Sequence, residues 1–164
     1  MIAFFKKIKE MVIQMKINTK YHGEIEIEDK AIINFEEGIP SFEDEKQFTI
    51  LPLDEDSPFL ILQSVTTPNL GFVIINPFDY YSDYTVDLTD STIQKLKIES
   101  EEQVAIYTIL TVQEPFENTT TNLSGPIVIN VKEKVGKQVI LNSDKYTTKH
   151  PIIKTPTAAS KGEK

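Results

Sequence analysis

The sequence predicts a mostly β, single-domain protein in which a curled antiparallel sheet forms a barrel-like fold with one or two short helices. The chain has 164 residues, the length of a single domain. About ten short stretches alternate apolar and polar residues, with turn residues between them. Between residues 15 and 152 helical periodicity is confined to two short pieces, and the chain contains no internal repeat. These features favour one antiparallel sheet system.

The predicted fold is organised around residues 125–141, which read as two strands joined by a turn. Apolar side chains occupy nearly every position of the first arm, and the alternation resumes at Val139 and Leu141. Gly136 lies between the arms, where a turn favours a residue that adopts positive φ. Because both arms are apolar on both faces, we expect a central hairpin covered on each side rather than a sheet edge.

The N-terminal half supplies further strand candidates. Residues 24–28 alternate isoleucine with glutamate, as in a half-buried antiparallel strand whose apolar face points inward. Residues 41–46 read as one helical turn, with Ser41 as the expected cap. The strand at 71–75 ends at Asn76-Pro77, because proline lacks the donor that a sheet ladder requires. Other strands are expected at 17–19, 31–35, 48–53 and 59–65.

The C-terminal half contains the clearest helix signal. Thr89 fits the N-cap position, and Leu88 and Ile93 form a hydrophobic staple across the first turn. This helix is expected to end near Lys97. The longest strand candidate covers 104–112, and shorter strands are expected at 119–123 and 145–147.

The two ends of the chain differ in composition from the middle. Residues 1–14 read as an N-terminal extension, and we expect the compact domain to cover 15–152. The extension is too short to span a bilayer, which needs about 20 apolar residues. It also lacks a signal-peptide cleavage site, although its helical spacing leaves a membrane-surface adaptor as one alternative. Residues 153–164 read as a disordered basic tail.

Charge separates the same regions. The formal net charge is −8, and residues 1–16 and 149–164 each carry +3, so residues 17–148 carry −14. Nucleic-acid recognition needs clustered lysine or arginine, so the acidic middle argues against direct nucleic-acid binding. An acidic domain attracts a basic partner, and the alternative explanation for the charge is solubility alone.

The residue inventory offers little catalytic chemistry. There is no cysteine, and the two histidines, His22 and His150, lie beside turns where packing or capping explains them better than catalysis. No glycine-rich phosphate loop or metal-spaced histidine pair occurs, and the acidic loop 54–56 lacks the pattern of a calcium loop. We therefore expect no catalytic residue, metal or cofactor. The alternative is a hydrolase-like enzyme that uses an acidic pair on a β-barrel.

Several short motifs together resemble the flagellar assembly factor FliW family over roughly residues 15–152. Each motif is weak alone, and their order and spacing carry the resemblance. The chain departs from the family pattern in its first 14 residues and at Ser41, where the family often has glycine. The motifs are NTKYHG (18–23), FEEGIPSFE (35–43), NP (76–77), PIVIN (126–130) and GKQVIL (136–141), followed by Tyr146 and HP (150–151).

The resemblance implies a small, cytoplasmic, β-rich protein without catalytic activity. Members of this family bind flagellin before its secretion. They also bind the RNA-binding translational regulator CsrA and relieve its repression of flagellin mRNA translation. Exchange between the two partners makes a feedback loop, since accumulated flagellin occupies the protein and frees the regulator.

If the chain has the two partners that the resemblance implies, two sets of residues are candidates for contact with them. Flagellin ends are amphipathic helices, which call for apolar contacts, although core packing explains the same aromatic residues equally well. The basic regulator calls for acidic residues around the aromatic loop and the helix start. The apolar candidates are Phe78, Tyr80, Tyr81 and Phe116, and the acidic candidates are Asp83, Asp87, Asp90 and Glu114.

Overall fold

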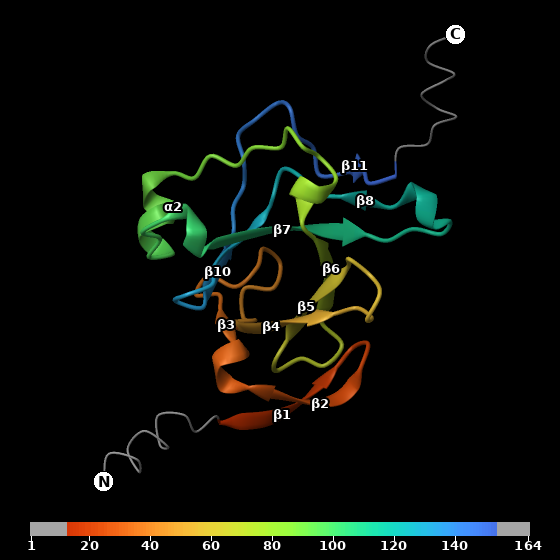
Figure 1. Ribbon diagram of the computed structural model, residues 1–164, viewed down its shortest axis with the longest axis vertical. Helices are drawn as coiled ribbons and strands as arrows, with labels where there is room; N and C mark the ends of the chain where they lie inside the picture. Colours follow the sequence, from red (N-terminus) through yellow and green to blue (C-terminus); the bar gives the residue numbers. More distant parts are fainter. Residues whose placement is uncertain (1–12, 154–164) are drawn as a thin grey trace.

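Short strands dominate the structure, a computed structural model that describes residues 13–153 (Figure 1). Most of the predicted extension and nearly all of the predicted tail therefore lie outside the described residues. The helical elements are the α-helix α2 (Asp90–Lys95) and four 3-10 helices, η1 (Asp29–Ala31), η2 (Pro77–Asp79), η3 (Glu101–Gln103) and η4 (Phe116–Asn118). The strands are β1 (Gln14–Thr19), β2 (Gly23–Glu28), β3 (Ile33–Asn34), β4 (Gln47–Pro52), β5 (Leu60–Ser64), β6 (Gly71–Ile75), β7 (Val104–Thr111), β8 (Thr120–Thr121), β9 (Ile127–Asn130), β10 (Val135–Gln138) and β11 (His150–Pro151).

Seven of the strands in residues 13–153 close into a barrel. They follow one another in the order β7-β6-β5-β4-β3-β10-β9, and β9 pairs with β7 to complete the circle. That closing pair is antiparallel, with Val104 opposite Asn130 and Tyr107 opposite Ile127. Because β9 has a partner on each side, the first arm of the hairpin lies inside the sheet as its sequence predicted, whereas the second arm is not covered throughout, since Ile140 beyond β10 is 63% exposed.

One apolar cluster fills the barrel interior. Alternate side chains of β4, β5, β6 and β9 meet there, as the period of two along a strand requires. Phe35 and Phe48 are fully buried in it and pack edge to face, with ring centroids 5.2 Å apart. The other buried members are Ile33, Ile39, Leu62, Ile74, Ile127 and Ile129.

The outer face of the barrel is covered in two places. On one side, α2 lies against β9 and the start of β7, where Leu96 packs with Val128 and Val139 (Figure 1). On the other side, Ile75 and Leu110 pack with Ile152 beyond β11. Val128 is therefore buried although it points away from the interior, which explains why the PIVIN segment is apolar at consecutive positions.

The β1–β2 ribbon packs beneath the barrel and is joined to it by a buried glutamine (Figure 1). Gln63 on β5 is fully buried, and its side-chain oxygen accepts a hydrogen bond from the Lys20 backbone N–H at 3.0 Å. Its amide group donates to the carbonyls of Pro68 and Leu70 at 3.1 Å each. A buried polar side chain is stable when its groups are paired in this way, so Gln63 fixes the ribbon and the β5–β6 turn together.

The structure corrects the role predicted for Gly136. This glycine lies within β10 opposite Ile129, and the turn falls earlier, at residues 131–134, where Lys134 has a φ of 57°. A Cβ atom at Gly136 would lie 2.7 Å from the Phe35 ring. Glycine is thus required by close packing against a buried ring and not by a turn.

Two other local predictions were wrong. Residues 41–46 form no helical turn, and Ser41 instead has a φ of 75°, with its N–H donating to the Glu43 side chain at 2.9 Å. Positive φ favours glycine, which accounts for the glycine expected there in the resembling family. The last strand is β11, at residues 150–151 rather than 145–147, and it pairs with β8.

No helix among residues 13–153 combines the length and the apolar character needed to cross a bilayer.

Gly136→Ala is expected to destabilise the protein by about 1–3 kcal/mol, since the new methyl group would overlap the Phe35 ring in a filled core. Chemical denaturation measures this free energy of unfolding. The control is Gly23→Asn. A Cβ atom at Gly23 would have no other atom within 4 Å, and asparagine tolerates the positive φ of this position. Equal losses for both variants would contradict the packing argument.

Candidate functional site

An apolar groove with an acidic rim lies between the segment that precedes α2 and the start of β7. We call it the α2 groove. Its volume is about 590 Å³. Most of its lining is aliphatic, and the charged groups along it are carboxylates. The lining residues are Phe78, Val86, Asp87, Leu88, Ile93, Ile98, Glu99, Ser100, Glu101, Val104 and Ile106.

Capping at both ends defines the short helix beside this groove. The Thr89 hydroxyl accepts a hydrogen bond from the Thr92 N–H at 3.1 Å, which confirms the predicted N-cap. At the other end, Lys97 has a φ of 55°, its N–H bonds to the Gln94 carbonyl, and the Ile98 N–H bonds to the Ile93 carbonyl at 3.0 Å. This is a Schellman motif, which turns the chain so that Ile93 and Ile98 both line the groove.

A buried asparagine fastens the helix to the barrel. Asn130, at the end of β9, is fully buried, and its amide group donates to the carbonyls of Leu96 and Lys97 at 2.8 and 3.1 Å. Its side-chain oxygen accepts from the backbone N–H groups of Lys132 and Glu133 at 3.0 and 3.1 Å. One side chain therefore fixes the helix end and the β9–β10 turn at once.

Two of the predicted contact residues line the α2 groove, and a third begins the helix beside it. Phe78 and Asp87 line it, and Asp90 is the exposed first residue of α2. Phe78 is 42% exposed and packs on Tyr84 with ring centroids 5.6 Å apart. The adjoining carboxylates, with no lysine among the described residues that line the groove, give this rim a negative potential.

The other predicted residues lie elsewhere. Tyr80 packs in the outer cluster with Ile75, and Tyr81 donates its hydroxyl to the Pro151 carbonyl. Burial raises the pKa of both phenols. Asp83 is exposed in the loop between these tyrosines and the groove.

Glu114 and Phe116 follow the far end of β7 (Figure 1). The groove lies at the start of β7, and the eight-residue strand runs about 23 Å at the usual rise per residue before it reaches these two residues beyond its end. Phe116 packs instead on Phe59, with ring centroids 5.7 Å apart. The structure therefore does not unite all of the predicted contact residues in one surface.

Sequence reasoning missed most of the groove. Its floor comes from Val104 and Ile106, which the sequence predicts only as part of the longest strand, and its rim includes Glu99 and Glu101 from the connection after α2. A usable signal was the alternation in Ile98-Glu99-Ser100-Glu101, which places apolar and acidic groups side by side just after a helix.

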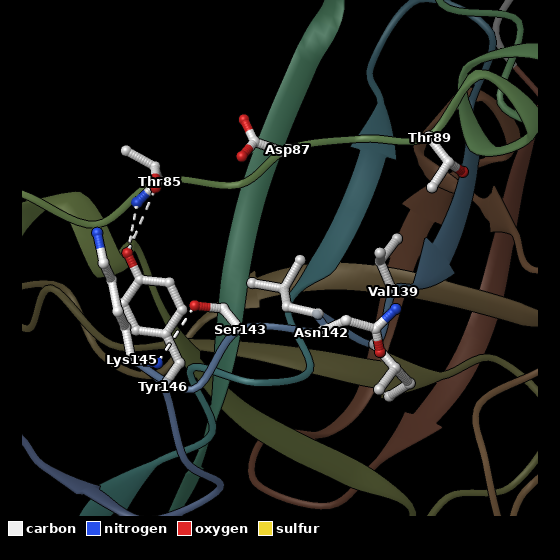
Figure 2. Close-up of a pocket in the computed structure, with 10 residues that line it drawn as sticks. Thr85, Asp87, Thr89, Val139, Asn142, Ser143, Lys145 and Tyr146 are labelled. Atoms are coloured by element: carbon white, nitrogen blue, oxygen red, sulfur yellow. Dashed lines mark hydrogen bonds between the residues drawn. The ribbon is translucent and has the colours of Figure 1, made fainter.

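A second hollow lies on the other side of the segment that carries Asp87 (Figure 2). We call it the edge groove. Its volume is about 330 Å³, and Tyr146 holds one end of it by accepting a hydrogen bond from the Thr85 N–H at 3.0 Å. Asp87 lines both hollows. The lining residues are Thr85, Asp87, Thr89, Val139, Ile140, Leu141, Asn142, Ser143, Lys145 and Tyr146.

Three carboxyl groups in residues 13–153, those of Glu37, Glu43 and Glu45, have a pKa held below the usual value. Hydrogen bonds from the Ser64 and Thr67 hydroxyls hold the pKa of Glu45 below its usual value. The Lys137 ammonium, 2.7 Å away, does the same for Glu37. In residues 13–153, every carboxyl group with a resolved pKa shift is shifted downward, whereas a general acid needs a raised pKa.

Both histidines bond to backbone groups, as their positions beside turns predicted. The His22 ring lies 2.8 Å from the Pro52 carbonyl, and the His150 ring accepts from the Thr147 N–H at 2.8 Å. In the acidic loop, the Asp54 carboxylate accepts from the Asp56 N–H. Among residues 13–153, no three His, Cys, Asp or Glu side chains are grouped to hold a metal ion.

Known proteins resemble this chain over most of its length. The sequence profile of the family described as FliW protein matches residues 16–152. A flagellar assembly factor FliW from Geobacillus thermodenitrificans is 59% identical over 139 residues, which are 85% of this chain and 96% of that protein. The protein of the same name from Bacillus subtilis is 53% identical over 138 residues, 84% of this chain and 96% of that protein.

A solved structure extends the comparison to the fold. It is the crystal structure of a flagellar assembly factor FliW, and it superposes with a TM-score of 0.82 at 54% sequence identity. The match covers 87% of this chain and 99% of that chain. The region that the family profile matches, residues 16–152, contains every residue that lines the two grooves.

Asn130→Ala is expected to cost about 2–4 kcal/mol of unfolding free energy, because it leaves two carbonyls and two N–H groups without the buried side chain that pairs with them. Chemical denaturation measures the loss. Asn142→Ala is the matched control, since Asn142 is exposed and its side chain has no hydrogen-bond partner within residues 13–153. A loss below 1 kcal/mol for Asn130→Ala, on the order of a surface substitution, would contradict the assigned role.

Proposed function

The chain belongs to the FliW family of flagellar assembly factors, which are not enzymes, and from this premise we propose that it is a cytoplasmic regulator that binds two proteins in turn. One partner is flagellin, bound before its secretion. The other is the RNA-binding regulator CsrA, whose repression of flagellin mRNA translation is relieved by binding. The observation that carries the proposal is the α2 groove, an apolar channel with an acidic rim.

The α2 groove suits an amphipathic helix. Helix recognition in grooves uses apolar anchors three or four residues apart, and the aliphatic floor offers Val104 and Ile106 from β7 and Ile93 from α2 to such anchors. Phe78 stands at one end of the floor with an exposed ring face. Flagellin ends are amphipathic helices without a partner before assembly, so they match the groove in shape and polarity.

The acidic rim suits the second partner. A protein that binds RNA presents basic groups, and Asp87, Glu99 and Glu101 offer it carboxylates while repelling phosphate. Because the same rim borders the helix groove, a bound flagellin helix and a bound regulator would occupy overlapping surface. Competition for this rim is the physical basis that we propose for partner switching.

Phe78→Ser is expected to weaken flagellin binding at least about tenfold, since an exposed aromatic anchor in a groove contributes a few kcal/mol. Phe116→Ser is the matched control. Phe116 has nearly the same exposure, 39% against 42%, and also rests on one other ring, but it lies beyond the far end of β7. Titration calorimetry measures both affinities. Equal losses, or a loss only for Phe116→Ser, would place the flagellin site elsewhere.

Regulator binding is expected to weaken as salt rises and to be weakened further by the double variant D87K/E101K. The variant E55K/D56K is the control, since it makes the same change in net charge within an exposed loop away from the groove. Size exclusion of the regulator complex during flagellin titration then tests exchange. Displacement supports switching, whereas a ternary complex or salt-independent binding contradicts it.

A further inference from the structure

The strand β10 continues beyond the residues that its outer neighbour covers. β3 pairs with β10 through a single position, Asn34 opposite Val135. On the other side the ladder continues past β10, because Val139 donates to the Pro126 carbonyl at 2.9 Å and Leu141 donates to the Ser124 carbonyl at 2.8 Å. Residues 139–141 therefore keep an extended course with a hydrogen-bonding partner on one side only.

The opposite side of this segment carries free main-chain groups. Successive residues of a strand direct their N–H and C=O groups to opposite sides, so those of Ile140 point away from the Val139 and Leu141 ladder. Within residues 13–153 the Ile140 N–H and C=O and the Asn142 N–H have no hydrogen-bond partner. They form a short open edge in a barrel that is otherwise closed.

The side chains at this edge do not protect it. Natural edges are usually guarded by proline, lysine or a bulge, yet residues 139–142 contain no proline and no charge. Ile140 is 63% exposed, while Val139 beside it is buried. Figure 2 shows the edge groove beside this segment, bounded on its far side by the segment that carries Thr85, Asp87 and Thr89.

We propose that this edge binds an extended segment of a basic protein partner, which adds one strand beside residues 138–142. Main-chain groups of the incoming strand would pair with Ile140 and Asn142, and an apolar side chain would cover Ile140. Asp87 and Lys145, which carry opposite charges, both line the edge groove, so the groove itself favours neither sign of charge. The preference for a basic partner therefore comes from the charge of the whole domain. The net charge of −14 over residues 17–148 disfavours a second copy of this chain and favours a basic partner.

This inference rests on the proposed function in one respect, since the basic partner that the proposed function names is the RNA-binding regulator. A helical flagellin end lacks the free main-chain groups that a strand edge recognises. The two partners would then share the rim at Asp87, which lines both grooves, while each uses a hollow of its own.

Ile140→Pro tests the edge in the full chain. Proline removes the N–H that would pair with the incoming strand, and it breaks no hydrogen bond of the described fold because that N–H bonds to nothing in residues 13–153. Regulator affinity is expected to fall at least about tenfold. Ile140→Ala keeps the N–H, so its expected loss is smaller, about threefold. Amide hydrogen exchange at residues 140 and 142 is expected to slow in the wild-type complex.

The outcomes separate this inference from the proposed function. If the wild-type protein binds no regulator, the proposed function fails and this inference fails with it. If it binds and Ile140→Pro binds equally well with unchanged amide exchange, the edge is not the site and the proposed function stands. A change in oligomeric state with Ile140→Pro would identify a second copy as the occupant and overturn the choice of partner. If Ile140→Pro lowers the unfolding temperature, amide exchange at residues 140 and 142 in the wild-type complex decides instead. Slower exchange on binding supports the edge as the site, and unchanged exchange overturns it.

Discussion

The pairing of β7 with β9 is the constraint on which the rest of the structure depends. It closes the barrel, so the ladder has no free side at β9. It also sets Val104 opposite Asn130, and this one register position links the groove floor to the residue that holds α2. Without this pair, Ile127 and Ile129 of β9 would no longer be held against the interior cluster, and Asn130 would no longer be placed to bind the end of α2. Fold and binding surface are therefore stabilised by the same few hydrogen bonds.

The function proposed here follows from how the segment before α2 divides one face of the barrel. Val86 and Leu88 line the α2 groove, whereas Thr85 and Thr89 line the edge groove. This alternation is the ordinary period of two of an extended chain. Asp87 borders both hollows, so a partner in either one meets the same carboxylate. Two chemically different surfaces, one apolar and one rich in main-chain groups, thus share a boundary.

Local signals in the sequence predicted the fold well where short-range chemistry decides it. The Thr89 cap and the glutamate–isoleucine alternation of β2 concern neighbouring residues and were readable directly. Gly136 was misread because the Phe35 ring that demands it lies a hundred positions away in the chain. The predicted contact residues are divided between two regions for a related reason. Phe78 and Asp87 meet at one groove while Phe116 does not, and only the course of β7 separates them.

The way in which the barrel closes has a consequence for synthesis. Strands β3 and β10 join near the point where Lys137 contacts Glu37, 100 residues apart in the sequence. Contacts of such long range form slowly, and they cannot form on a ribosome until the later strand has emerged. Both grooves need residues that follow β6, and the edge groove needs residues after β10. A nascent chain therefore presents neither groove in finished form until β9 and β10 have emerged, because Asn130 fastens α2 and residues from the segment 139–146 line the edge groove.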